Sequence, residues 1–234
     1  MYNMRIKALL LMLFVVSGTH VFSIDHKTAF GENWLQAEQY VREHRAEWKK
    51  TFKEFGVNPK VAEAVIFPEL IRYSRWQDKI ESSAVATLYV TKGKRLADFS
   101  IGRFQMKPSF TEEVEKEWNR STLARKYSLT FDTDNTSEAR RERTTRLKSA
   151  EGQCRYLAIF IRLQQIRHPE LLRCSKTEQV RRLATLYNGS YTASWQELEK
   201  LSHEKYYHTD MFKTKKTSLY CYADIAVEFY QREN

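Results

Sequence analysis

The stretch NPKVAEAVIFPELI, residues 58–71, predicts a helix that is buried on nearly all sides, because its apolar residues face every direction of a 3.6-residue period. Pro59 suits the first turn of such a helix, where its missing N–H is not needed. Pro68 lacks the donor that an interior turn uses, which predicts a kink or an end at that point. Charged residues within such a helix are anomalies, and Glu69 is one of them; the pattern alone favours a solvent-facing residue at a helix end.

Around this helix, the spacing of apolar residues predicts a mainly helical protein. Steps of three, four and seven residues over 33–55 give one apolar face to a helix that ends at Gly56. The helical period returns from residue 110 onward and again at 156–163, 177–186 and 219–230. The segment 84–104 instead indicates a β-hairpin with a glycine turn, and the polar stretch 132–148 indicates a loop or an exposed helix start. The predicted fold class is mainly α (α+β), a helical domain with a small β-hairpin insertion.

The first 23 residues have the three parts of a secretory signal peptide. Arg5 and Lys7 precede an apolar run at 8–16, and small and polar residues follow up to Ser23. The run is shorter than the roughly 20 apolar residues of a transmembrane helix, and no other segment approaches that length. We expect cleavage near Ser23, with an uncleaved N-terminal anchor as the alternative. The mature chain, residues 24–234, is expected to form one domain without a stable membrane span, in the periplasm, in the cell envelope or outside the cell.

The chain is basic, which predicts anionic partners. Its formal net charge is +10, and it becomes +8 when Arg5 and Lys7 leave with the signal peptide. Export argues against nucleic acid, whereas a negatively charged envelope polymer fits both the expected location and the sign of the charge. Much of the basic excess is interspersed with Glu, as in residues 140–143, and is typical of a solvated helix face. The oligomeric state is open.

Three cysteines bear on redox chemistry and metal binding. Cys154, Cys174 and Cys221 allow one disulfide and one spare thiol in an oxidising compartment, and the pairing is open. Their spacing matches no zinc pattern, and no Cys-x-x-Cys motif occurs. The sequence therefore predicts no metal, no other cofactor and no redox catalysis.

Three short motifs follow one another along the chain. The first is the proline-opened apolar helix at 59–69, which ends in Glu69. The second is GRFQMKP at 102–108, with the pattern G-x-x-Q-x-x-P, and the third is YNG at 187–189, at the end of a later predicted helix. Together, over roughly residues 59–189, these motifs resemble the soluble lytic transglycosylase and goose-type lysozyme superfamily, which implies a lysozyme-like fold.

This resemblance implies an enzyme that cuts peptidoglycan glycan strands between N-acetylmuramic acid and N-acetylglucosamine. It makes Glu69 the single catalytic acid, which protonates the leaving oxygen and then accepts the proton of the sugar's 6-hydroxyl, so that a 1,6-anhydro end forms. Such an acid needs a raised pKa, which apolar burial provides. The resemblance also implies a set of substrate-binding residues: Phe104, Gln105, Met106, Tyr187 and Asn188. Their ordinary structural roles would be a backbone tie in a turn for Gln105 and the closing of a helix for Tyr187.

One departure from the family pattern concerns the residue after the catalytic glutamate. Leu70 stands where the family usually has serine, which favours as an alternative a non-catalytic peptidoglycan-binding envelope protein. The stretch from Glu69 to Gln105 is also longer than usual in the family. A competing alignment uses Glu81-Ser82, but a polar stretch precedes that pair in place of the apolar helix.

A further point left open by the resemblance is the presence of a second acid. Asp98 and Asp78 lie in the segment where some lysozyme relatives carry an acidic partner for water. Asp98 is the candidate second acid, and its ordinary role is that of an exposed strand residue. With such an acid the protein would be a lysozyme-type muramidase, a hydrolase, instead of a transglycosylase.

Overall fold

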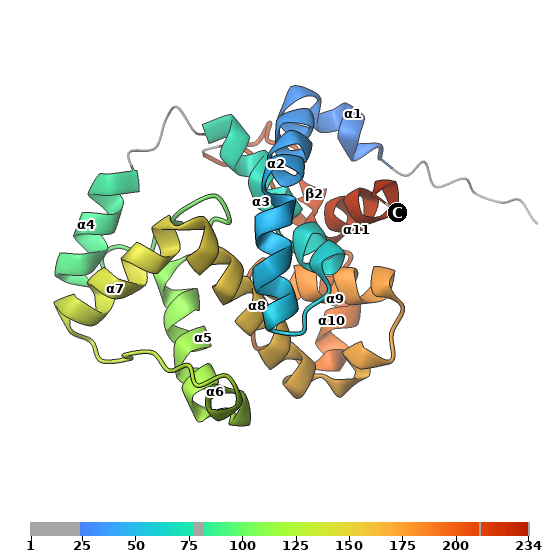
Figure 1. The fold of residues 1–234 in the computed structure, drawn as a ribbon. Coiled ribbons are helices and arrows are strands. Elements are labelled where there is room, and N and C mark those ends of the chain that lie inside the picture. The colour runs from blue at the N-terminus through green and yellow to red at the C-terminus, as the bar shows by residue number, and fades with distance from the viewer. Residues whose placement is uncertain (1–23, 77–81, 211, 234) are drawn as a thin grey trace, which may run out of the picture.

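Helices make up most of the computed structural model, which describes residues 24–76, 82–210 and 212–233 (Figure 1). They are α1 (His26–Phe30), α2 (Glu32–Glu54), α3 (Pro59–Trp76), α4 (Ser82–Lys92), α5 (Pro108–Arg120), α6 (Thr122–Lys126), α7 (Ser137–Lys148), α8 (Ala150–Arg167), the 3-10 helix η1 (Pro169–Leu172), α9 (Lys176–Tyr187), α10 (Trp195–Leu201) and α11 (Tyr222–Arg232). Two short strands, β1 (Lys205–Tyr207) and β2 (Tyr220–Cys221), pair antiparallel. The predicted class, mainly α with one small pair of antiparallel strands, is confirmed. The predicted signal peptide lies outside the described residues.

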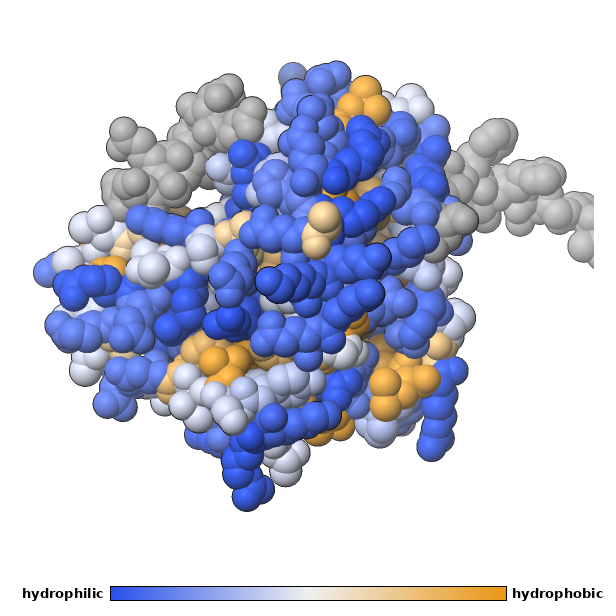
Figure 2. All heavy atoms as spheres, viewed as in Figure 1, coloured by the Kyte–Doolittle hydropathy of each residue, from blue (hydrophilic) through white to orange (hydrophobic). Residues whose placement is uncertain are grey.

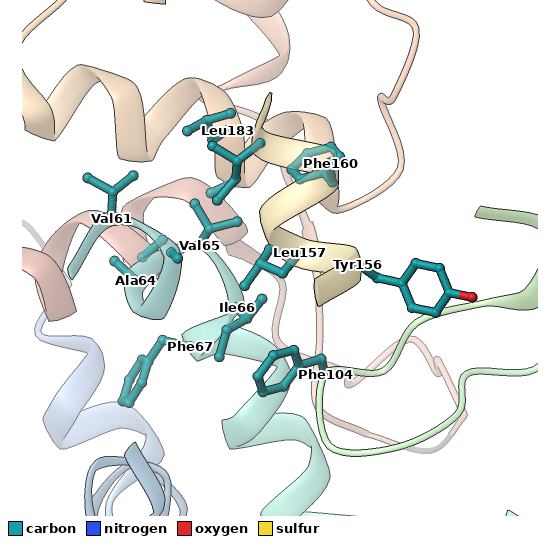
Figure 3. Packing of buried hydrophobic residues seen from close by; sticks show 14 of the residues in the cluster. Val61, Ala64, Val65, Ile66, Phe67, Phe104, Tyr156, Leu157, Phe160 and Leu183 are labelled. Atoms are coloured by element: carbon teal, nitrogen blue, oxygen red, sulfur yellow. The ribbon is translucent and has the colours of Figure 1, made fainter. Parts of the chain in front are cut away.

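Helix α3 lies at the centre of the core, as the apolar stretch predicted. It packs against α2, α8, α9 and α11, and Figure 3 shows its apolar side chains directed toward several of these neighbours. The Phe67 ring lies 3.8 Å from the Phe229 ring of α11 and 4.7 Å from the Trp34 ring of α2, measured between centroids. Burial of one such side chain contributes about 1.5–3 kcal/mol, so α3 is held firmly on several sides.

Pro68 does not end α3, which continues for two more turns to Trp76. The proline removes the backbone donor that the carbonyl of Ala64 would use. Two side chains from the C-terminal part of the chain contact the helix here. Tyr222 donates its hydroxyl to the carbonyl of Val65 (3.1 Å), and Tyr207 donates its hydroxyl to the carbonyl of Pro68. The chain beyond residue 200 therefore braces α3 where its own hydrogen bonding is interrupted.

The predicted β-hairpin at 84–104 is wrong, because most of its first half forms α4. Ala86 and Tyr89, three residues apart, are buried, and the two residues between them are exposed, which is a helical period. A run of seven mostly apolar residues is too short to show this period against a strand. Gly93 ends the helix instead of turning a hairpin: its φ is +76° and its N–H donates to the carbonyl of Tyr89 (2.8 Å).

The polar stretch 132–148 ends in α7, which buries part of its charge. Arg143 is 1% exposed and lies 2.5 Å from the carboxylate of Glu115, itself fully buried in α5. Arg146 approaches the other oxygen of this carboxylate at 2.9 Å, and the hydroxyl of Tyr156 donates to that oxygen as well. Figure 3 shows Tyr156 pointing away from the apolar cluster. The exposure predicted from the polar sequence therefore applies to only one face of α7.

The three cysteines are free thiols in the structure, so the disulfide that the sequence allowed is not formed. Cys154 and Cys221 are buried, and burial raises the pKa of both thiols. The Cys221 thiol also donates to the carbonyl of Ser202 (3.2 Å). Cys154 and Cys221 are therefore packed core residues.

The surface in view is largely hydrophilic. Figure 2 shows hydrophilic residues over most of the face that carries α2 and α7, with apolar residues in small separate patches. Within the described residues, no helix combines the length and the apolar character that crossing a bilayer requires.

Candidate functional site

A cleft of about 520 Å³ is lined by residues of the second and third sequence motifs, and the helix that carries the first motif contributes Arg72 to it. It lies among α3, the segment that leads into α5, and the end of α9. Four of the residues that the sequence analysis singled out as substrate-binding line it: Gln105, Met106, Tyr187 and Asn188. Arg72, one turn beyond Glu69 on α3, completes this part of the wall. Segments separated by more than 80 residues in the sequence therefore form one concave surface.

Glu69 lies just behind the wall of this cleft and is 4% exposed. Nη1 of Arg72 donates to both carboxylate oxygens, at 3.1 Å from Oε1 and 2.8 Å from Oε2. Burial raises the pKa of Glu69, and the positive charges of Arg72 and Lys107 oppose that rise. The expectation that Glu69 faces solvent at a helix end, drawn from the pattern alone, is wrong. Its carboxyl is buried and reaches the cleft through Arg72.

Arg72 is held by contacts on three sides. Its guanidinium carbon lies 4.5 Å from the centroid of the Tyr207 ring, and its Nε donates to the carbonyl of His208 (3.2 Å). The third contact is the carboxylate of Glu69. The side chain of Arg72 is 19% exposed, and Arg72 lines the cleft. Anything bound in the cleft would therefore meet Arg72 before Glu69.

Tyrosines surround the buried carboxyl. Burial raises the pKa of Tyr187 and of Tyr222 well above the ordinary value for a phenol, and the negative charge of Glu69 raises both further. Tyr187 does not donate to Glu69, however. Its hydroxyl donates to the carbonyl of Phe104 (2.7 Å) and so ties the end of α9 to the glutamine motif. Both phenols stay protonated at neutral pH and act here as neutral donors.

The glutamine motif forms a tight turn closed by an isolated bridge between Ile101 and Met106. Gly102 and Gln105 have positive φ angles of +73° and +52°. A Cβ on Gly102 would lie 2.5 Å from the carbonyl oxygen of Leu147, so only glycine fits. Gln105 donates from Nε2 to the carbonyl of Gly102 (2.8 Å), which is the backbone tie considered as its ordinary role, and it also lines the cleft.

Phe104 is the substrate-binding candidate that the structure moves elsewhere. It is 1% exposed, its ring packs edge-on against Trp48 of α2 at 5.1 Å, and it does not line the cleft. Its amide donates to Oε1 of Gln153 (2.7 Å). Successive residues of a tight turn point in different directions, so Phe104 anchors the turn in the core, while its neighbours Gln105 and Met106 face the cleft.

Asp98, the candidate second acid, lines the cleft but caps a helix. Its Oδ1 accepts from the amide of Ser109 (2.8 Å) and its Oδ2 accepts from the hydroxyl of the same residue (2.7 Å). Ser109 lies in the first turn of α5, where free amides and the helix dipole favour a carboxylate. Asp98 is therefore not simply an exposed strand residue. Asp78 and Glu81, the other acids considered, lie outside the described residues.

No protein-family model matches the chain, and no curated protein or solved structure matches it. The cleft therefore has to be interpreted from its own residues. Among the residues that the structure describes, His, Cys, Asp and Glu side chains nowhere gather in threes as a metal ion would need. What the site offers is a buried carboxyl with a raised pKa, a guanidinium in contact with it, and amide and hydroxyl groups along an open wall.

Arg72, Tyr207 and Tyr222 were not predicted as residues of the site. One signal for Arg72 was available, since residues three apart on a helix share a face and a Glu-Arg pair at that spacing can form an ion pair. Nothing in the sequence indicated that the two tyrosines contact α3, because they approach it from positions 139 and 157 residues later in the chain.

Proposed function

We propose that the protein is an exported peptidoglycan lytic transglycosylase that binds a glycan strand in this cleft and uses Glu69 as its proton donor. The observation that carries the proposal is the burial of Glu69 behind the cleft wall, with a pKa raised by that burial. Gln105 and Tyr187, from the other two motifs, line the same cleft. A carboxylic acid kept neutral near its substrate is what glycosidic bond cleavage requires.

Arg72 has to leave the carboxyl before Glu69 can donate a proton, because an ion pair favours the carboxylate. The exposed part of Arg72 lies in the cleft wall, where a saccharide brings hydroxyl and N-acetyl oxygens. In the proposed first step, Arg72 moves from Glu69 onto these oxygens. Burial, already the largest influence on the pKa of Glu69, then acts without its main opponent.

In the proposed reaction, one carboxyl, that of Glu69, performs both proton transfers. Glu69 gives its proton to the glycosidic oxygen as the bond to the anomeric carbon breaks, and positive charge develops on the sugar. The carboxylate that remains takes the proton of the sugar's own 6-hydroxyl as that oxygen bonds to the anomeric carbon. The product is a 1,6-anhydro end, no water is consumed, and Glu69 is again protonated. Asp98 is not needed for this sequence, and its two oxygens already bind Ser109.

Clearing of purified cell walls by wild type and by Glu69→Gln tests the proposal. We expect clearing by wild type and none by the variant, because the amide cannot donate an acidic proton. The mass of the products distinguishes the outcomes, since a transglycosylase product lacks one water relative to a hydrolase product. Clearing that persists in Glu69→Gln would remove Glu69 from the mechanism, and hydrated products would replace the transglycosylase by a lysozyme-type muramidase.

A second candidate function is non-catalytic binding of peptidoglycan, and the Glu69–Arg72 ion pair favours it. A pair that stays intact when saccharide binds would hold Glu69 as a carboxylate and make it part of the structure of α3. This candidate predicts that wild-type protein sediments with cell walls but does not clear them. The basic net charge supports either function, and attraction to an anionic wall should weaken with added salt.

A further inference from the structure

The turn at 101–106 borders a second cavity besides the cleft. Gln105 and Met106 face the cleft, whereas Ile101, Gly102 and Arg103 line a separate cavity of about 400 Å³. Tyr40 of α2, Tyr73 of α3 and Lys148 at the end of α7 contribute to it as well. Figure 1 shows the green loop that follows α4 between α7 and α2. We call this space the Arg103 cavity.

Arg103 lies between two aromatic rings. Its guanidinium carbon lies 4.5 Å from the centroid of the Tyr40 ring and 4.3 Å from that of the Tyr73 ring. Two tyrosines on different helices thus hold the guanidinium in place. Stacking of this kind leaves the edge of the group, with its N–H donors, free for a ligand.

Arg103 differs from the other stacked arginines in having no carboxylate partner within the described part of the chain. Arg72, Arg146, Arg167 and Arg182 also stack on aromatic rings, and each of them forms an ion pair with a glutamate. In those four arginines the acid is supplied by the protein. Arg103 forms no such ion pair with any described residue, although Glu43 lines a neighbouring cavity together with Arg103 and Tyr40.

The rest of the Arg103 cavity also favours an anion. Lys148 adds a second positive charge, and none of the described residues that line the cavity is acidic. Glu47, whose charge acts on Tyr40, is exposed on α2 and does not line the cavity. Lys148 ends α7 and Ala150 begins α8, so the negative and positive ends of two helix dipoles meet at this lining, and its positive charge comes from Arg103 and Lys148.

We propose that the Arg103 cavity binds a carboxylate, and that this carboxylate belongs to the peptide stem carried by the glycan strand. The site itself follows from the geometry, and the identity of the ligand rests on the proposed function. A planar guanidinium matches the two oxygens of a carboxylate, and a guanidinium already fixed by two rings loses little freedom on binding. Arg103 and Gln105 belong to one turn, so the cleft and the cavity border the same turn.

Calorimetric titration of the full chain tests this proposal with a soluble stem tripeptide and with the same peptide carrying amides in place of its carboxylates. We expect the amidated peptide to bind wild type about tenfold or more weakly, as for loss of a charge-assisted hydrogen bond. Arg103→Gln should bind the free peptide about tenfold more weakly and no longer distinguish the two forms. Arg125→Gln, at an exposed arginine of α6, is the matched control and should bind as wild type does.

Equal binding of the two peptides by wild type would overturn the proposal, and so would unchanged binding by Arg103→Gln. Loss of two stacking contacts can weaken the fold, so thermal unfolding of each variant is measured as well. If Arg103→Gln does not fold, two other measurements test the proposal. Wild type should still bind the amidated peptide more weakly than the free peptide, and Lys148→Gln should bind the free peptide more weakly than wild type does. Inorganic phosphate is the third ligand: binding of phosphate that needs Arg103, without binding of the peptide, would replace the carboxylate assignment.

Peptide-free glycan strands separate this proposal from the proposed function. Their cleavage depends on Glu69 and does not involve a stem carboxylate. Peptide binding that needs Arg103, in a protein that cleaves no glycan, would leave the Arg103 cavity standing while the transglycosylase fails. Glycan cleavage by a protein that does not bind the peptide would give the opposite result.

Discussion

Glu63 of α3 is a buried carboxyl whose titration should be visible in the stability of the protein. It is 1% exposed, and its Oε2 accepts from Nε of Arg45 (3.0 Å). Burial raises the pKa of Glu63 to about 7, against the lowering effect of Arg45. It lies six residues before Glu69 on the same helix but does not line the cleft. Glu63→Gln keeps the shape of the side chain and removes its titration.

The sign and size of the effect follow from linkage between protonation and folding. The ordinary pKa of 4.5 describes Glu63 in the unfolded chain, so between pH 4.5 and about 7 the folded protein binds the proton more tightly. Protonated Glu63 therefore contributes stability that is fully present below pH 4.5 and is lost as the pH rises through about 7. The difference corresponds to about 3 kcal/mol, since each pKa unit is worth ~1.4 kcal/mol.

Urea unfolding of both proteins at several pH values measures this difference. The free energy of unfolding of wild type should fall, relative to that of Glu63→Gln, by about 3 kcal/mol between acid and mildly alkaline pH. Carboxyls other than Glu63 titrate in both proteins, so the difference between the two curves isolates this group. Two parallel curves would refute the reasoning. Clearing of cell walls should survive in Glu63→Gln, which makes it the matched control for Glu69→Gln.

Three further substitutions test the site. Arg72→Met leaves Glu69 buried without its partner and should lower the free energy of unfolding by about 3 kcal/mol at neutral pH. The loss should be smaller at acid pH, where the carboxyl is protonated, and urea unfolding that gives equal losses at both pH values would contradict this. Gly102→Ala forces a Cβ to within 2.5 Å of a carbonyl oxygen at a φ of +73°. The free energy of unfolding, followed by thermal unfolding, should fall by about 2–4 kcal/mol. Stability equal to that of wild type would mean that the turn changes its conformation to accept the Cβ. Asp98→Asn weakens the cap at Ser109 by about 1 kcal/mol and should leave clearing and product mass unchanged. Loss of clearing at normal stability would place Asp98 in the chemistry.

Periodic segments were predictable because their burial follows from local spacing. The apolar stretch of α3 and the single apolar face of α2 each extend over several turns, long enough to distinguish a helix from a strand. The prediction for the segment 84–104 was wrong because its apolar run is too short to distinguish a helix from a strand. Gly93, with its positive φ, suits a helix end as well as a hairpin turn. The described strands, β1 and β2, gave no signal because each contains only two or three residues.

The candidate site was predictable where a motif fixes the backbone. The turn of the glutamine motif brings Gln105 and Met106 to the cleft, and the end of α9 brings Tyr187 and Asn188. Which side of a turn each residue faces depends on its φ and ψ angles, and spacing did not reveal that Phe104 points into the core. The ion pair between Glu69 and Arg72 was also missed, although their spacing on α3 allows it, because the packing around both groups decides whether such a pair forms.

The hydroxyls of Tyr207 and Tyr222 brace α3 around Pro68 from segments that follow the last of the three motifs. A nascent chain that has reached only α9 already contains Glu69, Gln105 and Tyr187, but it lacks both braces. The helix that carries the carboxyl is then unsupported at its proline, and Arg72 has no ring on which to stack. The site therefore depends on the last part of the chain, and a protein cut after the third motif would keep all three motifs without the contacts that support them.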